Sequence, residues 1–249
     1  MQYNWSWSVF LETGPDGVHG YLGNLFAGLG WTLCLSGATA ILAFCLGSVI
    51  GTMRTLPSRI LSSIGTIYVE LFRNIPLLVQ MFLWYFVLPD IVPADFGQAI
   101  KQMPRPYNTF VPALLCFSCY GGARIAEQLR AGIQSLPAGQ LQAATALGLT
   151  TAQSYRRVVL PEAFCIVIPA LTSEFTSVVK YSSVALTIGL LELTGQARAM
   201  QEFSFHIFEA FSAATFGYLL INLLVVTAMG RLEQWLAVPG LIGAKGSAL

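Results

Sequence analysis

Long apolar stretches alternate with short polar segments along the chain, and the apolar stretches determine the expected fold. The longest lies between Asp16 and Arg54 and contains no acidic or basic residue apart from the titratable His19. A helix needs about 20 residues to cross roughly 30 Å of hydrocarbon. This stretch therefore predicts one membrane-spanning helix over about residues 24–53, with room for tilt.

Four further apolar stretches predict four more spanning helices. They cover about residues 60–89, 110–131, 161–183 and 210–230. With 55% hydrophobic and 10% charged residues among 249, the chain is more apolar than one soluble core can hide. Because lipid offers the backbone no hydrogen-bond partners, the spans must be helical or form a closed barrel. We expect an all-α integral membrane protein with about five transmembrane helices.

Lysine and arginine in the connecting segments predict the orientation, because short loops rich in these residues stay on the cytoplasmic side. In a five-span arrangement, one side carries Arg54, Arg59, Arg156, Arg157, Arg231 and Lys245. The other side carries only Lys101, Arg105 and Arg198. We expect the N-terminus outside the cell and the C-terminus in the cytoplasm.

Three regions follow from this arrangement. Residues 1–23 form an extracytoplasmic segment, in which Trp5, Trp7 and Phe10 are suited to anchor in the headgroup layer. Residues 24–235 form the transmembrane domain, and residues 236–249 form a cytoplasmic tail.

Several classes of site are not expected. Cys116 and Cys119 form a CxxC pair, but no second pair or histidine cluster accompanies it, so we predict packing roles and no metal site. A formal net charge of +1 gives no reason to expect nucleic acid. A Walker A loop needs Gly-Lys followed by Ser or Thr. None of the lysines stands in that context, so the chain cannot hydrolyse ATP by that chemistry. We expect a chain that is not an enzyme, has no ATPase site of its own and binds no cofactor.

The predicted cytoplasmic loop, residues 135–161, has an ordered pattern of helix signals. Residues 135–139, SLPAG, should end the third span, and residues 140–147 are good helix formers. Gly148 is suited to stop that helix, and Thr150 with Gln153 matches a capping box for a second short helix that runs to about Val159. Pro161 is suited to the first turn of the next span. From the residues alone, this elbow either enters another protein's groove or lies on anionic lipid through Arg156 and Arg157.

The loop resembles the signature of ATP-binding-cassette importer permeases: Glu-Ala-Ala, three residues, Gly, nine residues, then Ile-x-Leu-Pro. The matching residues are Ala143, Ala144, Gly148, Leu160 and Pro161, with Gln142 in place of the glutamate and Val158 in place of the isoleucine. The resemblance implies a type I importer permease fold in the bacterial inner membrane. It also implies that the loop docks on a separate ATPase subunit, which holds ATP–Mg. The coupling residues expected on this basis are Gln142, Ala143, Ala144, Leu147, Gly148, Thr151, Arg156 and Arg157.

A second stretch, ELFRNIPLLVQ from Glu70 to Gln80, resembles the polar amino acid permeases of that family, in particular those for glutamate and aspartate. The resemblance implies a second permease subunit, identical or homologous, and a periplasmic amino acid-binding protein. Pro76 and Pro169 each remove a helical donor inside a span. Each proline either faces inward, toward a pathway or a subunit contact, or only kinks the helix where it packs against its neighbours.

Charged residues inside spans are costly, so each one needs a partner or a function. Glu70 and Arg73, spaced i,i+3, are expected to form a structural ion pair, and Glu127 can pair with Arg130 in the same way. Arg124 is then suited to grip a substrate carboxylate. The alternative is a ladder of Arg124, Glu127 and Arg130 that only holds the helices together.

The expected substrate pathway therefore comprises Arg124, Glu127 and Glu174, with Glu174 meeting either Arg124 or the amino group of the substrate. A rival function remains open. An ion-gradient-driven secondary transporter or channel would use Glu70, Glu127 and Glu174 as relay groups, and an assembly subunit would use none of them.

Overall fold

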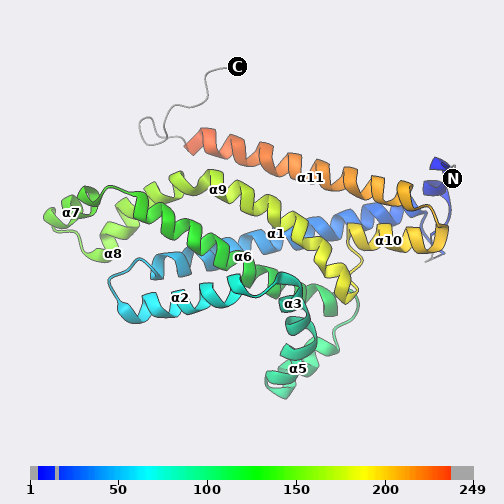
Figure 1. Ribbon diagram of the computed structural model, residues 1–249, viewed down its shortest axis with the longest axis horizontal. Helices are drawn as coiled ribbons and strands as arrows, with labels where there is room; N and C mark the ends of the chain where they lie inside the picture. Colours follow the sequence, from blue (N-terminus) through cyan, green and yellow to red (C-terminus); the bar gives the residue numbers. More distant parts are fainter. Residues whose placement is uncertain (1–4, 15–16, 237–249) are drawn as a thin grey trace. The chain divides into compact units, whose positions relative to one another are not determined.

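A computed structural model describes residues 5–14 and 17–236 (Figure 1). These residues are helical nearly throughout and contain no β-strand, only one isolated antiparallel bridge between Thr13 and Gly20. The expected all-α fold is confirmed. The predicted cytoplasmic tail lies outside the described residues from position 237 onward.

The elements follow one another from blue to red in Figure 1. They comprise α-helices, two 3₁₀-helices (η1, η4) and two π-helical turns (η2, η3). In chain order they are η1 (Trp7–Leu11), α1 (Tyr21–Met53), α2 (Arg59–Asn74), α3 (Leu77–Phe82), η2 (Leu83–Val87), α4 (Leu88–Ile91), α5 (Ala94–Lys101), α6 (Tyr107–Ser135), α7 (Ala138–Ala146), α8 (Thr151–Ser154), η3 (Tyr155–Val159), α9 (Leu160–Tyr181), η4 (Ser182–Ile188), α10 (Leu193–Ser204) and α11 (Ile207–Leu236).

The predicted spans correspond to helical stretches long and apolar enough to cross a membrane. Among the described residues there are four of these, or five if a bent pair counts as one span. The four are Tyr21–Met53, Tyr107–Ser135, Thr151–Ile188 and Ile207–Leu236, and the bent pair is Arg59–Asn74 with Leu77–Ile91. The break in the pair occurs at Pro76, which lacks a backbone N–H and adopts an extended ψ of 136°. At Pro169, in contrast, α9 continues through the proline.

The helix that contains the fourth candidate span does not begin at Pro161, where the sequence predicts the start of that span. The helix runs without interruption from Thr151 through the π-helical turn η3 into α9. In this turn the N–H of Leu160 donates to the carbonyl of Tyr155, five residues earlier. The wider turn lets the chain stay helical beside a proline, which has no N–H and would clash with a carbonyl in a regular α-turn.

The same arrangement occurs before Pro89. There the N–H of Leu88 donates to the carbonyl of Leu83, again five residues earlier. Both π-helical turns thus lie directly N-terminal to a helical proline.

The described residues divide into two compact units. The first contains the described parts of Met1–Ile41, Ile75–Ser118 and Thr176–Leu224. One apolar cluster in it joins Tyr21 of α1, Leu193 and Met200 of α10 and Ala214 of α11. A second cluster joins residues of α1, α3, α6 and η4: Leu35, Met81, Phe117 and Ile188.

The N-terminal aromatic residues gather in this first unit. Trp5 stacks on Trp7 with a centroid distance of 5.7 Å and lies equally far from Phe208 of α11, and Trp7 stacks on Phe10 at 6.1 Å. Both tryptophans are more than half exposed. Their location at the membrane interface stays a prediction.

The second unit contains the described parts of Leu42–Asn74, Cys119–Phe175 and Val225–Leu249. Its clusters pack α6 against the end of α1, against α2 and against α9, through residues that include Ile50, Val69, Ile125, Ala126 and Val167. The approach of α1 to α6 depends on Gly47 and Gly51. A Cβ on Gly51 would lie 2.8 Å from the carbonyl oxygen of Ala126, which is too close for any side chain. The small residues permit the two helices to pack closely.

Candidate functional site

The turn between α7 and α8 has the geometry that the sequence predicts. Gly148 adopts the left-handed conformation with a φ of +79°. Its N–H donates to the carbonyl of Thr145 at 2.9 Å, and the N–H of Leu149 donates to that of Ala144 at 3.1 Å. These two bonds define a Schellman motif, in which glycine ends the helix without steric strain.

The start of α8 is also capped as predicted. The backbone N–H of Gln153 donates to the Thr150 hydroxyl at 3.3 Å, and the N–H of Thr150 donates to the Gln153 side chain at 2.9 Å. Both bonds of a capping box are therefore present. Further along, the buried Tyr155 donates its hydroxyl to the carbonyl of Thr55 at 2.6 Å, which ties η3 to the segment between α1 and α2.

The predicted coupling residues differ in exposure. Leu147 is 83% exposed, which is unusual for a large apolar side chain. The other exposed coupling residues are Gln142, Ala143, Gly148, Thr151, Arg156 and Arg157. Ala144, which the resemblance also implies as a coupling residue, is only 4% exposed and does not belong to the exposed face. It packs inside the chain, so the outward face consists of the other residues.

Within the second unit, the guanidinium of Arg124 on α6 reaches Glu174 on α9. The Nε–H of Arg124 donates to both carboxylate oxygens, at 2.9 Å to Oε1 and 2.8 Å to Oε2. Glu174 is 1% exposed, whereas 40% of the Arg124 side chain is exposed. The ring of Tyr120 lies 5.9 Å from the guanidinium carbon. Of the two partners expected for Glu174, the structure shows Arg124.

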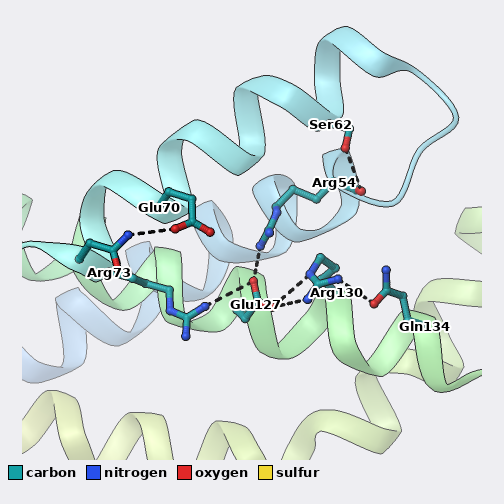
Figure 2. Close-up of polar contacts among 8 residues, drawn as sticks. Arg54, Ser62, Glu70, Arg73, Glu127, Arg130 and Gln134 are labelled. Atoms are coloured by element: carbon teal, nitrogen blue, oxygen red, sulfur yellow. Dashed lines mark hydrogen bonds and ion pairs between the residues drawn. The ribbon is translucent and has the colours of Figure 1, made fainter.

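Glu127, the third predicted pathway residue, lies in a different cluster (Figure 2). Arg130 donates to it from the same helix, as predicted, with an Nε–Oε1 distance of 3.1 Å. Arg54, which directly follows α1, donates to the other carboxylate oxygen. Arg73 of α2 places its Nη1 3.5 Å from that same oxygen. Three arginines from three segments thus converge on one carboxylate.

This arrangement corrects one expectation and one alternative. Glu70 and Arg73 do not form an ion pair in the described part of the chain, because Arg73 reaches Glu127 and Glu70 accepts from Asn74 at 2.9 Å. Nor do Arg124, Glu127 and Arg130 form one ladder, since Arg124 pairs with Glu174. In the sequence analysis, Arg54 was used only to predict the orientation of the chain. Its position directly after a predicted span is the sequence feature that could have indicated a role beside Glu127.

A buried carboxylate outside the candidate spans was not anticipated either. Glu192 is fully buried at the N-cap of α10. It accepts from the hydroxyls of Thr32 and Tyr218 at 3.2 and 2.6 Å, and from the backbone N–H groups of Thr194 and Gly195 at 3.1 and 3.0 Å. Burial raises the pKa of Glu192 above the usual carboxyl range, although these hydrogen bonds act to lower it. The residue ties α10 to α1 and α11.

Known proteins resemble this chain over nearly its whole length. The family described as binding-protein-dependent transport system inner membrane component matches residues 43–238. The glutamate/aspartate import permease protein GltJ of Escherichia coli (strain K12) is 44% identical over 246 residues, which cover 98% of this chain and 100% of that protein. The probable amino-acid ABC transporter permease protein PatM of Vibrio harveyi is 31% identical over 207 residues, 83% of this chain and 87% of that protein.

A solved structure agrees with these matches. A chain from the crystal structure of an amino acid ABC transporter with histidines superposes with a TM-score of 0.73 at 30% sequence identity. The superposition covers 86% of this chain and 95% of that one. The family match and the full-length similarity show that this chain belongs to the inner-membrane components of binding-protein-dependent transport systems.

Proposed function

We propose that the chain is the membrane subunit of an ATP-driven importer that carries glutamate and aspartate into the cell. The observation that carries this proposal is the 44% identity with a glutamate/aspartate import permease across 98% of the chain. Similarity of this extent covers the spans, the polar loop and the charged residues together.

The energy source is a separate ATPase subunit, which holds ATP–Mg and docks on the loop between α6 and α9. Two features support this role. The Schellman motif at Gly148 and the capping box at Thr150 give the loop a defined bend, and Leu147 presents an apolar side chain to the outside. A rigid, exposed elbow can transmit movement of a docked partner into the helix that follows it. That helix runs from Thr151 into α9.

The cargo is recognised in the spans by Arg124. A guanidinium offers several N–H donors in one plane, which suits a carboxylate. The buried Glu174 accepts from the Nε–H of Arg124, while 40% of the Arg124 side chain is exposed. Glu174 therefore holds Arg124 in place, and it is also suited to receive the amino group of the cargo when the pair opens.

Two further partners complete the importer. Transport sites commonly form between repeated membrane units, so a second permease subunit, identical or homologous, is required. A periplasmic binding protein delivers the amino acid. Binding of ATP and delivery of cargo bias two conformations of the assembly in different directions.

Uptake into proteoliposomes tests the proposal. The chain is reconstituted with its ATPase, permease and binding-protein partners, and entry of radiolabelled glutamate is measured with ATP or with an imposed proton gradient. ATP alone should support uptake, and a protonophore should leave it unchanged. Uptake that needs the gradient and ignores ATP would contradict the proposal and favour an ion-coupled transporter.

The cargo role of Arg124 has its own test in the same system. Arg124→Lys should lower glutamate uptake by at least about tenfold, because charge-assisted hydrogen bonds contribute about 1.5–3 kcal/mol. Uptake of glutamine, which lacks the side-chain charge, should fall less. Arg198→Lys is the matched control, since Arg198 is exposed and pairs with Glu202 on α10. Equal losses for both cargoes would exclude carboxylate recognition by Arg124.

A further inference from the structure

The cluster around Glu127 contains more positive than negative charge. Arg54, Arg73 and Arg130 all lie within ion-pair distance of this one carboxylate (Figure 2). Glu70 also lies beside the cluster (Figure 2), and it accepts from Asn74. Even when Glu70 is included, the guanidinium groups outnumber the carboxylates.

Two of the arginines have donors that the described part of the chain does not satisfy. Arg73 makes the 3.5 Å ion pair and no hydrogen bond there, and 46% of its side chain is exposed. The side chain of Arg54 is only 8% exposed, yet its Nε–H has no acceptor among the described residues. Arg130, in contrast, donates hydrogen bonds to Glu127 and to the side-chain oxygen of Gln134, the latter from Nη1 at 2.7 Å. A buried guanidinium donor that stays unpaired is costly, so the Nε–H of Arg54 favours the binding of an acceptor, and the exposed Arg73 offers further donors beside it.

The cluster lies beside the end of α1 and within the last third of α6. Arg54 directly follows Met53, the last residue of α1, and Glu127 lies eight residues before Ser135, the last residue of α6. At 1.5 Å per residue this is about 12 Å from the end of α6. Uncompensated charge within a candidate span is unfavourable unless a counter-ion accompanies it.

We propose that Arg73, Arg54 and Arg130 around Glu127 form a binding site for a carboxylate or phosphate oxyanion. Two sources share this chemistry. One is the headgroup of an anionic phospholipid, whose acyl chains would lie along the exposed apolar side chains of α2, which are Ile60, Ile64, Ile67 and Leu71. The other is the acidic cargo near one end of its path, and this source rests on the proposed function.

The test uses the full chain, assembled with its partner subunits in lipid nanodiscs. In one arm the nanodiscs contain phosphatidylglycerol, and lipid retained after transfer to detergent is measured by native mass spectrometry. In the other arm they contain phosphatidylcholine only, and equilibrium binding of radiolabelled glutamate is measured. Each arm compares Arg73→Gln with Arg59→Gln. Arg73 is suited to substitution because it is half exposed, and Arg59 is a matched control because it is an exposed arginine on the same helix.

We expect Arg73→Gln to lower the affinity for one of the two anions by about five- to tenfold, as the loss of one basic side chain implies. Arg73→Lys, which keeps the charge, should lose less. A loss in the first arm identifies lipid, and a loss in the second identifies cargo. If neither anion depends on Arg73, or if Arg59→Gln causes the same loss, the site does not exist. The lipid arm needs no transport, so its outcome is independent of the proposed function.

Discussion

Arg124 and Glu174 form an ion pair in which only one member is shielded from solvent, because Glu174 is 1% exposed and Arg124 is 40% exposed. Removing Arg124 would leave a buried carboxylate without its cation. Loss of one partner from a buried pair costs about 3–5 kcal/mol, with the lower end expected here because Arg124 is accessible. Arg124→Gln should lower the midpoint of thermal unfolding in detergent by about 5–10 °C.

The double variant Arg124→Gln/Glu174→Gln should recover most of that loss, because two neutral amides carry no unpaired charge. Unfolding can be followed by tryptophan fluorescence. Additive losses in the double variant would mean that the two side chains contribute separately.

The helices were predictable because their signals are local. Apolar runs placed the spans to within a few residues, and the cap signals at Gly148 and Thr150 occur as expected. The continuous helix from Thr151 into α9 was not predicted, because a proline in a sequence usually marks the boundary of a helix. The π-helical turn that carries the helix past Pro161 depends on one changed hydrogen bond, from Leu160 to Tyr155.

Spacing along one helix predicted some ion pairs but not others, and the pair of Arg124 with Glu174 on another helix was only one of two alternatives. The i,i+3 spacing identified Arg130 as a partner of Glu127 correctly, yet the same spacing was misleading for Glu70 and Arg73. Long side chains reach neighbouring helices as easily as the next turn. Partners of Glu127 from other segments, such as Arg54, can therefore be identified only from the packing of α1, α2 and α6.

Gly148 should be replaceable by asparagine but not by alanine. No atom lies within 4 Å of a Cβ at this position, so the cost of substitution comes from the positive φ alone. Alanine in the left-handed conformation costs about 1–2 kcal/mol, while asparagine tolerates it. We expect Gly148→Ala to reduce cargo-stimulated ATP hydrolysis by the assembled importer, and Gly148→Asn to retain most of it.

Gly139→Ala is the control for this series. Gly139 lies in α7, and a Cβ added to it would also have no atom within 4 Å, but its φ is not in the left-handed region. This variant should behave like the unsubstituted chain. Equal activity of the Ala and Asn variants at position 148 would show that the turn geometry does not matter for coupling.

Gly51 should not tolerate even a methyl group. A Cβ there would lie 2.8 Å from the carbonyl oxygen of Ala126 and 3.1 Å from Cβ of Leu129, and backbone cannot move aside as a flexible side chain can. Overpacking of this kind costs about 1–3 kcal/mol. Gly51→Ala should therefore lower the thermal midpoint by several degrees, whereas Gly37→Ala in the same helix, with open space around its Cβ, should not. Similar midpoints for both variants would contradict the close packing of α1 on α6.

Glu192 should make stability depend on pH. Its pKa is raised by burial, so the folded chain holds this proton more tightly than the unfolded chain does. Its contribution is then fully present below the ordinary carboxyl pKa of about 4 and is lost as the pH rises through the raised folded value. Glu192→Gln imitates the protonated group, so its thermal midpoint should decline less than that of the natural chain when the pH rises from about 4 to 8.

Glu202→Gln is the control, because Glu202 is an exposed carboxylate on α10. Its thermal midpoint should change with pH as that of the natural chain does. An unchanged slope in Glu192→Gln would mean that Glu192 stays ionised across this range and that its four hydrogen bonds outweigh its burial.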